Sequence, residues 1–192
     1  MFAAMHGKPC GKRAFGNGDL LEYIVDGLDL VALLARPEVR SVFERLPGAH
    51  RDLGIELVSV DDAEVRMRLP VVSRVARRAT SAAVHAGAVI TTMDSAMGLA
   101  VLVHLSVPSS LATLELRYDE LREPVESPSI FVAARCVGIF HDVAYVDAVA
   151  KDDEGDFARG VARFVITGGG GDFMAGAMRM LAGDVGRTEE QV

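Results

Sequence analysis

The stretch VHAGAVITTMDSAMGLAV, residues 84–101, constrains the fold more than any other part of the chain. Its residues are small or apolar on almost every helical stripe, so a helix here must be surrounded by the rest of the protein. Asp94 interrupts this pattern near the middle, and His85 stands at its start. We therefore predict a core helix over about residues 85–104 that carries a carboxylate in need of a partner or a function.

Strand-like runs flank this helix. Two precede it, at residues 54–60 and 63–69, and the second alternates cleanly between apolar and charged side chains. Four follow it, at residues 111–119, 129–139, 142–152 and 155–167. One helix among six antiparallel strands can be surrounded only if the sheet curls around it. The sequence thus predicts an α+β fold in which a curled antiparallel sheet wraps one long central helix.

The rest of the chain adds segments at both ends of this domain. Residues 1–18 read as a loose arm, and residues 19–53 as a helical extension, with helices at 19–35 and 37–46 and a turn at PGAH. The predicted domain covers residues 54–167, with an irregular segment before the long helix. Residues 168–192 read as a glycine linker followed by a short amphipathic C-terminal helix.

Composition excludes several classes of function. The chain has 192 residues, is 50% hydrophobic and carries a net charge of −7, which suits one domain with a real core and disfavours nucleic-acid binding. Cys10 and Cys136 lack ligand-like neighbours, so we expect two reduced thiols in a cytoplasmic protein without a metal or cofactor. A central aspartate costs about 2.5–3.5 kcal/mol in a membrane span, so a buried helix is favoured over a membrane protein.

Asp94 has two interpretations. As a structural residue it caps a loop or meets an arginine inside the core; as a functional residue it lines a cleft and performs chemistry. The helix start favours chemistry, because its unpaired N–H groups and the positive end of the helix dipole can hold a developing oxyanion. His85 and Asp94 lie about 13 Å apart along one helix axis. A site that uses both therefore needs two subunits, with the two helices antiparallel across a two-fold axis.

These motifs resemble the hotdog-fold acyl-CoA thioesterases, in particular the phenylacetic-acid-degradation (PaaI-like) group. In that family the helix starts with His-Gly-Gly and carries its catalytic aspartate nine residues after the histidine. HAGAVITTMD keeps this spacing, DSAMGLA is similar to the usual continuation, and TLELRYDELREP at residues 113–124 is similar to the next family strand. The likeness runs from about residue 54 to residue 167.

The resemblance implies a fold, a reaction and a set of roles. Asp94 would be the general base or nucleophile, and the N–H of Ala86, assisted by Gly87, would polarise the thioester carbonyl. His85 would orient that turn, and the Thr113 hydroxyl would place Asp94 or the attacking water. Coenzyme A would enter as part of the substrate, and the protein would form a homodimer or a dimer of dimers.

Further residues are candidates for binding the substrate. Arginines can contact the phosphates of coenzyme A, and Met97 lies one helical turn after Asp94. The substrate-binding candidates are Arg74, Arg77, Arg78, Arg117, Arg122 and Met97.

The sequence departs from the family pattern at four places, and these keep other functions open. Ala86 replaces the first glycine of His-Gly-Gly, and Glu120 replaces an aromatic residue. Only Thr80 or Ser81 stands where relatives carry an upstream Asn or Gln, and FHD at residues 140–142 replaces a Gly-Arg pair that is common in the fourth strand. A non-catalytic hotdog protein that binds acyl-CoA or a partner is therefore the alternative. A hotdog dehydratase or hydratase ranks lower, since the proline-containing motif of those enzymes is missing. The terminal segments would either cover the acyl site or build a tetramer.

Overall fold

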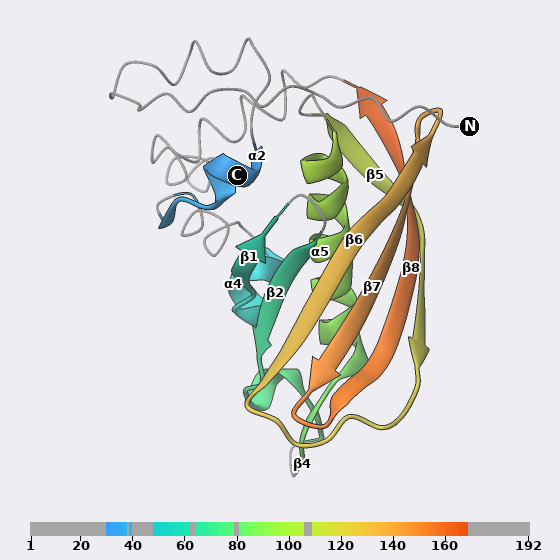
Figure 1. Ribbon diagram of the computed structural model, residues 1–192. Coiled ribbons are helices and arrows are strands. Elements are labelled where there is room, and N and C mark those ends of the chain that lie inside the picture. The colour runs from blue at the N-terminus through green and yellow to red at the C-terminus, as the bar shows by residue number, and fades with distance from the viewer. Residues whose placement is uncertain are drawn as a thin grey trace, which may run out of the picture.

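The computed structural model describes residues 30–37, 39, 48–61, 64–78, 81–105 and 109–168. The main elements are one six-stranded antiparallel sheet and one long helix, α5, which lies in the hollow of the sheet (Figure 1). The strands of this sheet are β1 (Glu56–Val60), β2 (Val65–Pro70), β5 (Ser110–Glu120), β6 (Ser129–Phe140), β7 (Val143–Asp152) and β8 (Gly155–Gly168). The predicted strands and the curled sheet are confirmed, with boundaries that differ by one or two residues.

The sheet has the strand order β1-β2-β6-β7-β8-β5. After β2 the chain passes through α5 (Ala86–His104) to β5 at the far edge, and β6, β7 and β8 then fill the gap. The helix therefore lies across the sheet and contacts β2, β5, β6, β7 and β8. This crossing puts β5, the strand that follows the helix, at an edge where one side of its backbone has no neighbouring strand in the described chain.

The helix supplies one side of the core. Nine of its residues are buried, and they pack against the inward-facing side chains of the sheet, such as Ile130, Val132, Val146 and Phe164. By length and hydropathy α5 would also fit a membrane span. Its apolar character is explained by this packing, because a core helix needs an apolar surface against each strand that it contacts.

A β-bulge in β5 determines which side chains point at the helix. The register with β8 passes from Thr113↔Phe164 to Glu115↔Arg163, so that Leu114 is an extra residue. Phe164 and Ala162 are buried on the inner face, so their partners Thr113 and Leu116 share that face. Without the bulge, strand alternation would send one of these two side chains to the outer face.

Two segments differ from the prediction. The prediction of a turn at PGAH is wrong in part, since helix α4 (Ala49–Leu53) begins at the third residue of this stretch. The helix lies between Gly48 (φ 82°) and Gly54 (φ 70°). The irregular segment before α5 contains a short 3₁₀ turn, η1 (Ser73–Val75), and a hairpin of β3 (Ala76–Arg78) and β4 (Ser81–Val84). These strands have three and four residues, too few for an alternating pattern to be recognisable.

The terminal extensions are only partly described. Helix α2 (Leu30–Leu34) is the end of the predicted helix at 19–35, and Leu34 belongs to the core. Both α2 and α4 contact α5. The arm at 1–18, most of the helix predicted at 37–46, and the glycine linker and C-terminal helix lie outside the described residues.

Candidate functional site

The start of α5 is shaped by His85. It is the N-cap residue, and its Nδ1 atom accepts a hydrogen bond from the N–H of Gly87 at 3.0 Å. Its own N–H donates to the carbonyl of Val75 at 2.7 Å, which ties the helix start to the segment that precedes β3. The imidazole therefore acts as an N-terminal cap, a role usually played by Ser, Thr, Asp or Asn, and it fixes the position of the first helical turn.

The N–H groups of Ala86 and Gly87, the first two residues of the helix, differ in whether they have an acceptor. The Gly87 N–H is engaged by His85, and the N–H of Ala88 donates to the His85 carbonyl at 3.0 Å. For Ala86, no acceptor is found among the described residues. One N–H group at the positive end of the helix dipole is thus available to an oxygen atom of a ligand.

Gly87 leaves room for the capping imidazole. A Cβ atom at this position would lie 3.1 Å from Nδ1 and 3.3 Å from Cε1 of His85, tighter than ordinary contacts. The second glycine of the His-Gly-Gly pattern therefore makes room for the capping imidazole. Ala86 already carries a methyl group, half-exposed beside its N–H.

Asp94 has a hydrogen-bond partner on the neighbouring strand. The Thr113 hydroxyl donates to Oδ1 of Asp94 at 2.9 Å. Asp94 is half-buried and Thr113 is exposed, so the pair lies at the surface rather than inside the core. Of the two interpretations of Asp94, an ion pair with an internal arginine is excluded for the described residues, because the ion pairs of this part of the chain do not include it.

One face of α5 is not covered by the sheet. The side chains on it are small or polar, and their hydroxyl groups are hydrogen-bonded within the helix, as between Thr91 and the Gly87 carbonyl at 2.9 Å. Among the described residues of one chain, the expectation that the helix is surrounded therefore does not hold for this face. The residues of this face that are half-buried or exposed are Gly87, Thr91, Asp94 and Ser95.

The edge strand β5 continues this uncovered surface. Residues 112–115 are all exposed, and Leu114, the bulged residue, is 57% exposed. Because the helix start and Asp94 are nine residues apart on the same helix, a ligand carbonyl cannot meet both in one chain. The uncovered face of α5 and the β5 edge are the surfaces that a second copy would have to cover.

The three arginines before the helix lie close to its start along the backbone. Arg74 is in η1, and Arg77 and Arg78 are in β3, whose strand pairs with β4 directly before His85. Their side chains lie outside the described residues, as do Thr80 and the Ser81 side chain. The structure thus brings these backbones to the helix start.

Arg117 and Arg122 are not brought to Asp94. Arg117 pairs in register with the exposed Val161 on the outer face of the sheet, opposite the helix, and its side chain bonds Asp119 at 3.0 Å. The Arg122 guanidinium binds both carboxylate oxygens of Asp152, whose side chain is fully buried, and the carbonyl of Gly155 at 3.0 Å. The structure gives these two residues other partners, and their binding of a substrate stays a prediction.

The Arg122–Asp152 pair holds a loop at one end of the molecule. Asp152 also accepts hydrogen bonds from the N–H groups of Val125 and Glu154, at 3.0 and 2.9 Å. The Arg122 guanidinium and these N–H groups hold the pKa of Asp152 below its usual value. The pair therefore fastens residues 121–128 to the β7–β8 turn.

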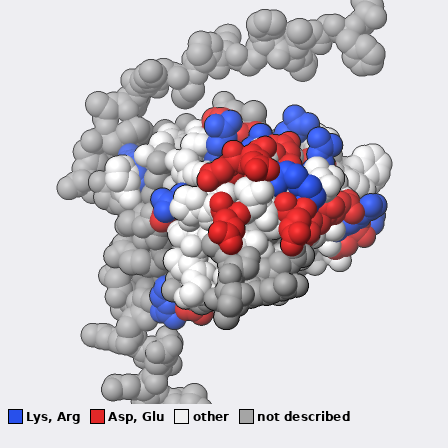
Figure 2. All heavy atoms as spheres, turned by 90° about the horizontal axis from the view of Figure 1, so that it is seen from below, with Lys and Arg blue, Asp and Glu red and all other residues white. Residues whose placement is uncertain are grey.

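The end of the molecule that carries this loop and the start of α5 is rich in acidic side chains. Figure 2 views it from below and shows acidic groups across it, with basic groups between them. The exposed acidic residues of the loop and the β7–β8 turn are Glu120, Glu123, Glu126, Asp153, Glu154 and Asp156. A polyphosphate that approached here would be repelled unless arginines contacted it directly.

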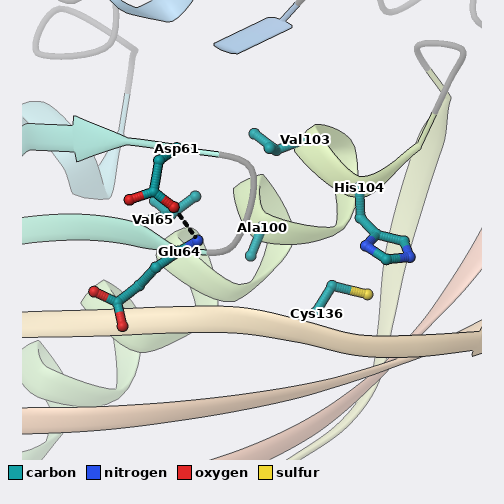
Figure 3. A pocket seen from close by; sticks show the side chains of 7 residues that line it. All are labelled: Asp61, Glu64, Val65, Ala100, Val103, His104 and Cys136. Carbon is teal, nitrogen blue, oxygen red and sulfur yellow. Dashed lines mark hydrogen bonds between the residues drawn. The ribbon is translucent and has the colours of Figure 1, made fainter. Parts of the chain in front are cut away.

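At the opposite end of α5 lies a small pocket with different side chains. It is lined by Asp61, Glu64, Val65, Ala100, Val103, His104 and Cys136 (Figure 3). Asp61 accepts a hydrogen bond from the N–H of Glu64 at 2.8 Å, and burial raises the pKa of the Cys136 thiol. A thiol of raised pKa is a poor nucleophile at neutral pH. Cys10 lies outside the described residues.

Solved structures resemble this chain in fold. No protein-family model matches the sequence, and no curated protein matches it. A thioesterase-family protein from Silicibacter pomeroyi superimposes with a TM-score of 0.60 at 24% identity, over 69% of this chain and 97% of that one. A thioesterase from Haemophilus influenzae superimposes with a TM-score of 0.58 at 16% identity, over 72% of this chain and 88% of that one. A conserved protein from Pseudomonas aeruginosa superimposes with a TM-score of 0.56 at 25% identity, over 69% of this chain and 98% of that one.

The curled sheet around α5 is thus the hotdog fold, as predicted, and it is shared with proteins of the thioesterase superfamily. Of the predicted site, the structure brings Asp94 to Thr113 and His85 to Gly87. Sequence reasoning missed the β-bulge at Leu114, which aims Thr113 at the helix. No turn residue or glycine marks this position, so the sequence held no signal for it.

Proposed function

We propose that this protein hydrolyses thioesters of the acyl-CoA class to a free acid and coenzyme A. The observation that carries the proposal is the hydrogen bond between Thr113 and Asp94 on the uncovered face of a helix whose first N–H has no acceptor among the described residues. A carboxylate fixed at the surface and an oxyanion donor are the two parts that acyl transfer to water needs.

The reaction uses these groups in order. Thr113 holds Oδ1 of Asp94, and Oδ2 takes a proton from water as the water oxygen bonds to the thioester carbon. The carbonyl oxygen becomes an oxyanion and is stabilised by the Ala86 N–H and the helix dipole. The carbon–sulfur bond then breaks, and the leaving thiolate takes the proton from Asp94.

The active unit in this proposal is a homodimer. Asp94 of one protomer works with the helix start of its partner, since the two groups of one chain lie about 13 Å apart along the axis. The edge strand β5 and the uncovered face of α5 support this arrangement, because both are surfaces that a second copy can cover. We still expect the thioesterase to be of the PaaI-like type.

The nucleotide of coenzyme A needs cations near the helix start. Arg74, Arg77 and Arg78 are the candidates, because their backbones adjoin that start. The acidic residues of the same end make this requirement stricter, since the phosphates must avoid them. We expect the affinity for coenzyme A to fall with rising salt.

The first test replaces Asp94. Release of the coenzyme A thiol is followed with a thiol reagent for acetyl, longer straight-chain and aromatic acyl thioesters. Asp94→Asn is expected to lower kcat by about 10²–10⁴, with an unchanged circular dichroism spectrum. An Asp94→Asn variant with the wild-type rate would remove the proposed base from the reaction.

A second test asks whether the site is shared. Asp94→Asn and Ala86→Pro chains are each prepared, unfolded together and refolded as a mixture. If the site lies between protomers, a mixed dimer regains one intact site, and the mixture recovers about a quarter of the wild-type rate. If each chain carries its own complete site, the mixture stays as inactive as its components.

A non-catalytic acyl-CoA-binding protein is the second candidate. The observation that favours it is the hydrogen bond from Gly87 to His85, which leaves a single N–H group for the oxyanion. Calorimetric titration with acyl-CoA that shows binding, together with no release of thiol from any thioester, would support this function over hydrolysis.

A further inference from the structure

The side-chain ends of two methionines of α5 pack against one glycine of the sheet. Met93 and Met97 are fully buried, and Gly160 lies on the inner face of β8. A Cβ atom at Gly160 would lie 2.8 Å from Cε of Met97 and 3.0 Å from Sδ of Met93. The nearest backbone atom, the carbonyl oxygen of Arg117, would be 3.6 Å away. The absent side chain of Gly160 therefore makes room for the two methionine ends.

These methionines flank the candidate catalytic residue. Met93 directly precedes Asp94, and Met97 follows it by one helical turn. Methionine is unbranched and adapts its shape easily, so its end is the part of a core that moves with the least strain. The wall of the core beside Asp94 is thus adjustable at the point where it meets Gly160.

The surface next to this wall is apolar and partly exposed. Ile90 on α5 and the inward-facing Leu116 and Tyr118 on β5 are half-buried, whereas the side chains deeper between helix and sheet are fully buried. Tyr118 lies opposite Gly160 in the register of β5 and β8. An acyl group whose carbonyl is at Asp94 would enter this apolar boundary between α5 and β5 and end against the methionines.

We propose that Gly160, through Met93 and Met97, sets the length of the acyl group that the site accepts. This inference rests on the proposed function, because it takes the acyl-CoA site to be at Asp94. Gly160 is a specificity-determining residue that acts through the methionines. An added methyl group at Gly160 displaces the methionine ends toward the acyl group and shortens the space for it.

The test uses Gly160→Ala. Carbon atoms in contact are about 3.5–4.0 Å apart, so the Met97 methyl must move by about 0.7–1.2 Å. Because a flexible side-chain end can make this movement, the variant is expected to fold. The lost space is about one methylene group, which corresponds to about a fourfold change in affinity.

Binding is measured apart from turnover. S-alkyl-CoA thioethers with chains of two to twelve carbons are titrated by calorimetry into the wild type and the variant. Gly160→Ala is expected to move the tightest-binding chain to one or two carbons shorter, and to weaken chains beyond the wild-type optimum by about fourfold or more. Shorter chains should bind as before. The control is Gly138→Ala on β6, where an added Cβ meets no atom within 4 Å, and it should leave the whole profile unchanged.

The outcomes separate this inference from the proposed function. If thioethers bind with the shifted profile but thioesters are not hydrolysed, the inference stands and the hydrolase proposal fails. If thioesters are hydrolysed but the profile of Gly160→Ala equals that of the wild type, or falls equally at all lengths, the inference is overturned and hydrolysis stands. If no thioether binds to any of the proteins, both are overturned.

Discussion

The substitution Ala86→Pro tests the oxyanion donor in isolation. Proline removes the backbone N–H, which at Ala86 donates to no described acceptor, and leaves the capping bond from Gly87 to His85 in place. Ala86 is the first residue of α5, the helical position at which proline is most readily accepted. His85 has φ −75° and ψ 132°, the extended conformation that a residue before proline prefers.

The expected magnitudes follow from these features. Since no internal hydrogen bond is lost, the free energy of unfolding should not fall, and the restricted unfolded chain favours a gain of about 0.4–1 kcal/mol. The loss of one oxyanion donor is expected to cost about 2.7–4 kcal/mol of transition-state stabilisation, a decrease of 10²–10³ in kcat. Catalysis and stability should thus change in opposite directions.

The assay compares kcat for thiol release with the melting temperature of the same preparation. Ala49→Pro is the matched control, because Ala49 is likewise the first residue of a helix, behind Gly48, and is expected to keep full activity. Ala86→Gly, which retains the N–H, should remain active as well. An Ala86→Pro protein that is stable and as fast as the wild type would refute the role of this N–H.

Three other predictions concern the neighbours of these groups. Thr113→Val removes the 2.9 Å hydrogen bond to Asp94 and should lower kcat by about 10–100-fold, since hydrogen bonds to charged groups contribute about 1.5–3 kcal/mol. Thr113→Ser keeps the hydroxyl group and should retain most of the wild-type rate. The control Thr167→Val loses a hydrogen bond to the Ser110 carbonyl and should leave the rate unchanged. Gly87→Ala places a Cβ 3.1 Å from His85 Nδ1, so we expect a weakened cap, a loss of about 1 kcal/mol in unfolding experiments and a larger loss in kcat. Asp152→Asn leaves Arg122 without its carboxylate and should destabilise the fold by about 3 kcal/mol in urea titrations at neutral pH. The pKa of Asp152 is lower in the folded protein than in the unfolded chain, where it is about 3.9. The stability that the Asp152 carboxylate contributes is therefore present above the unfolded pKa and is lost as the pH falls through the lower folded pKa. The difference in the free energy of unfolding between wild type and Asp152→Asn should thus shrink in acid.

The sequence alone determined the architecture. A helix that is apolar on nearly all stripes, set among six alternating strands, can be satisfied only by a sheet that curls around it, and this is the fold that the structure has. The same stretch identified Asp94 and the helix start at His85 by their spacing. These features are local, because helical and strand periodicity are properties of consecutive residues.

The tertiary structure decided which of these groups meet. The sequence named Thr113, but the bulge at Leu114 that turns it toward Asp94 depends on the register between β5 and β8. Arg122 was an equally good candidate for a phosphate until the fold placed it on Asp152, thirty residues later in the chain. Gly160 carries no signal in the sequence, because its importance comes from two methionine ends that reach it from another element. Such contacts join distant parts of the chain, and only the packing of helix on sheet determines them.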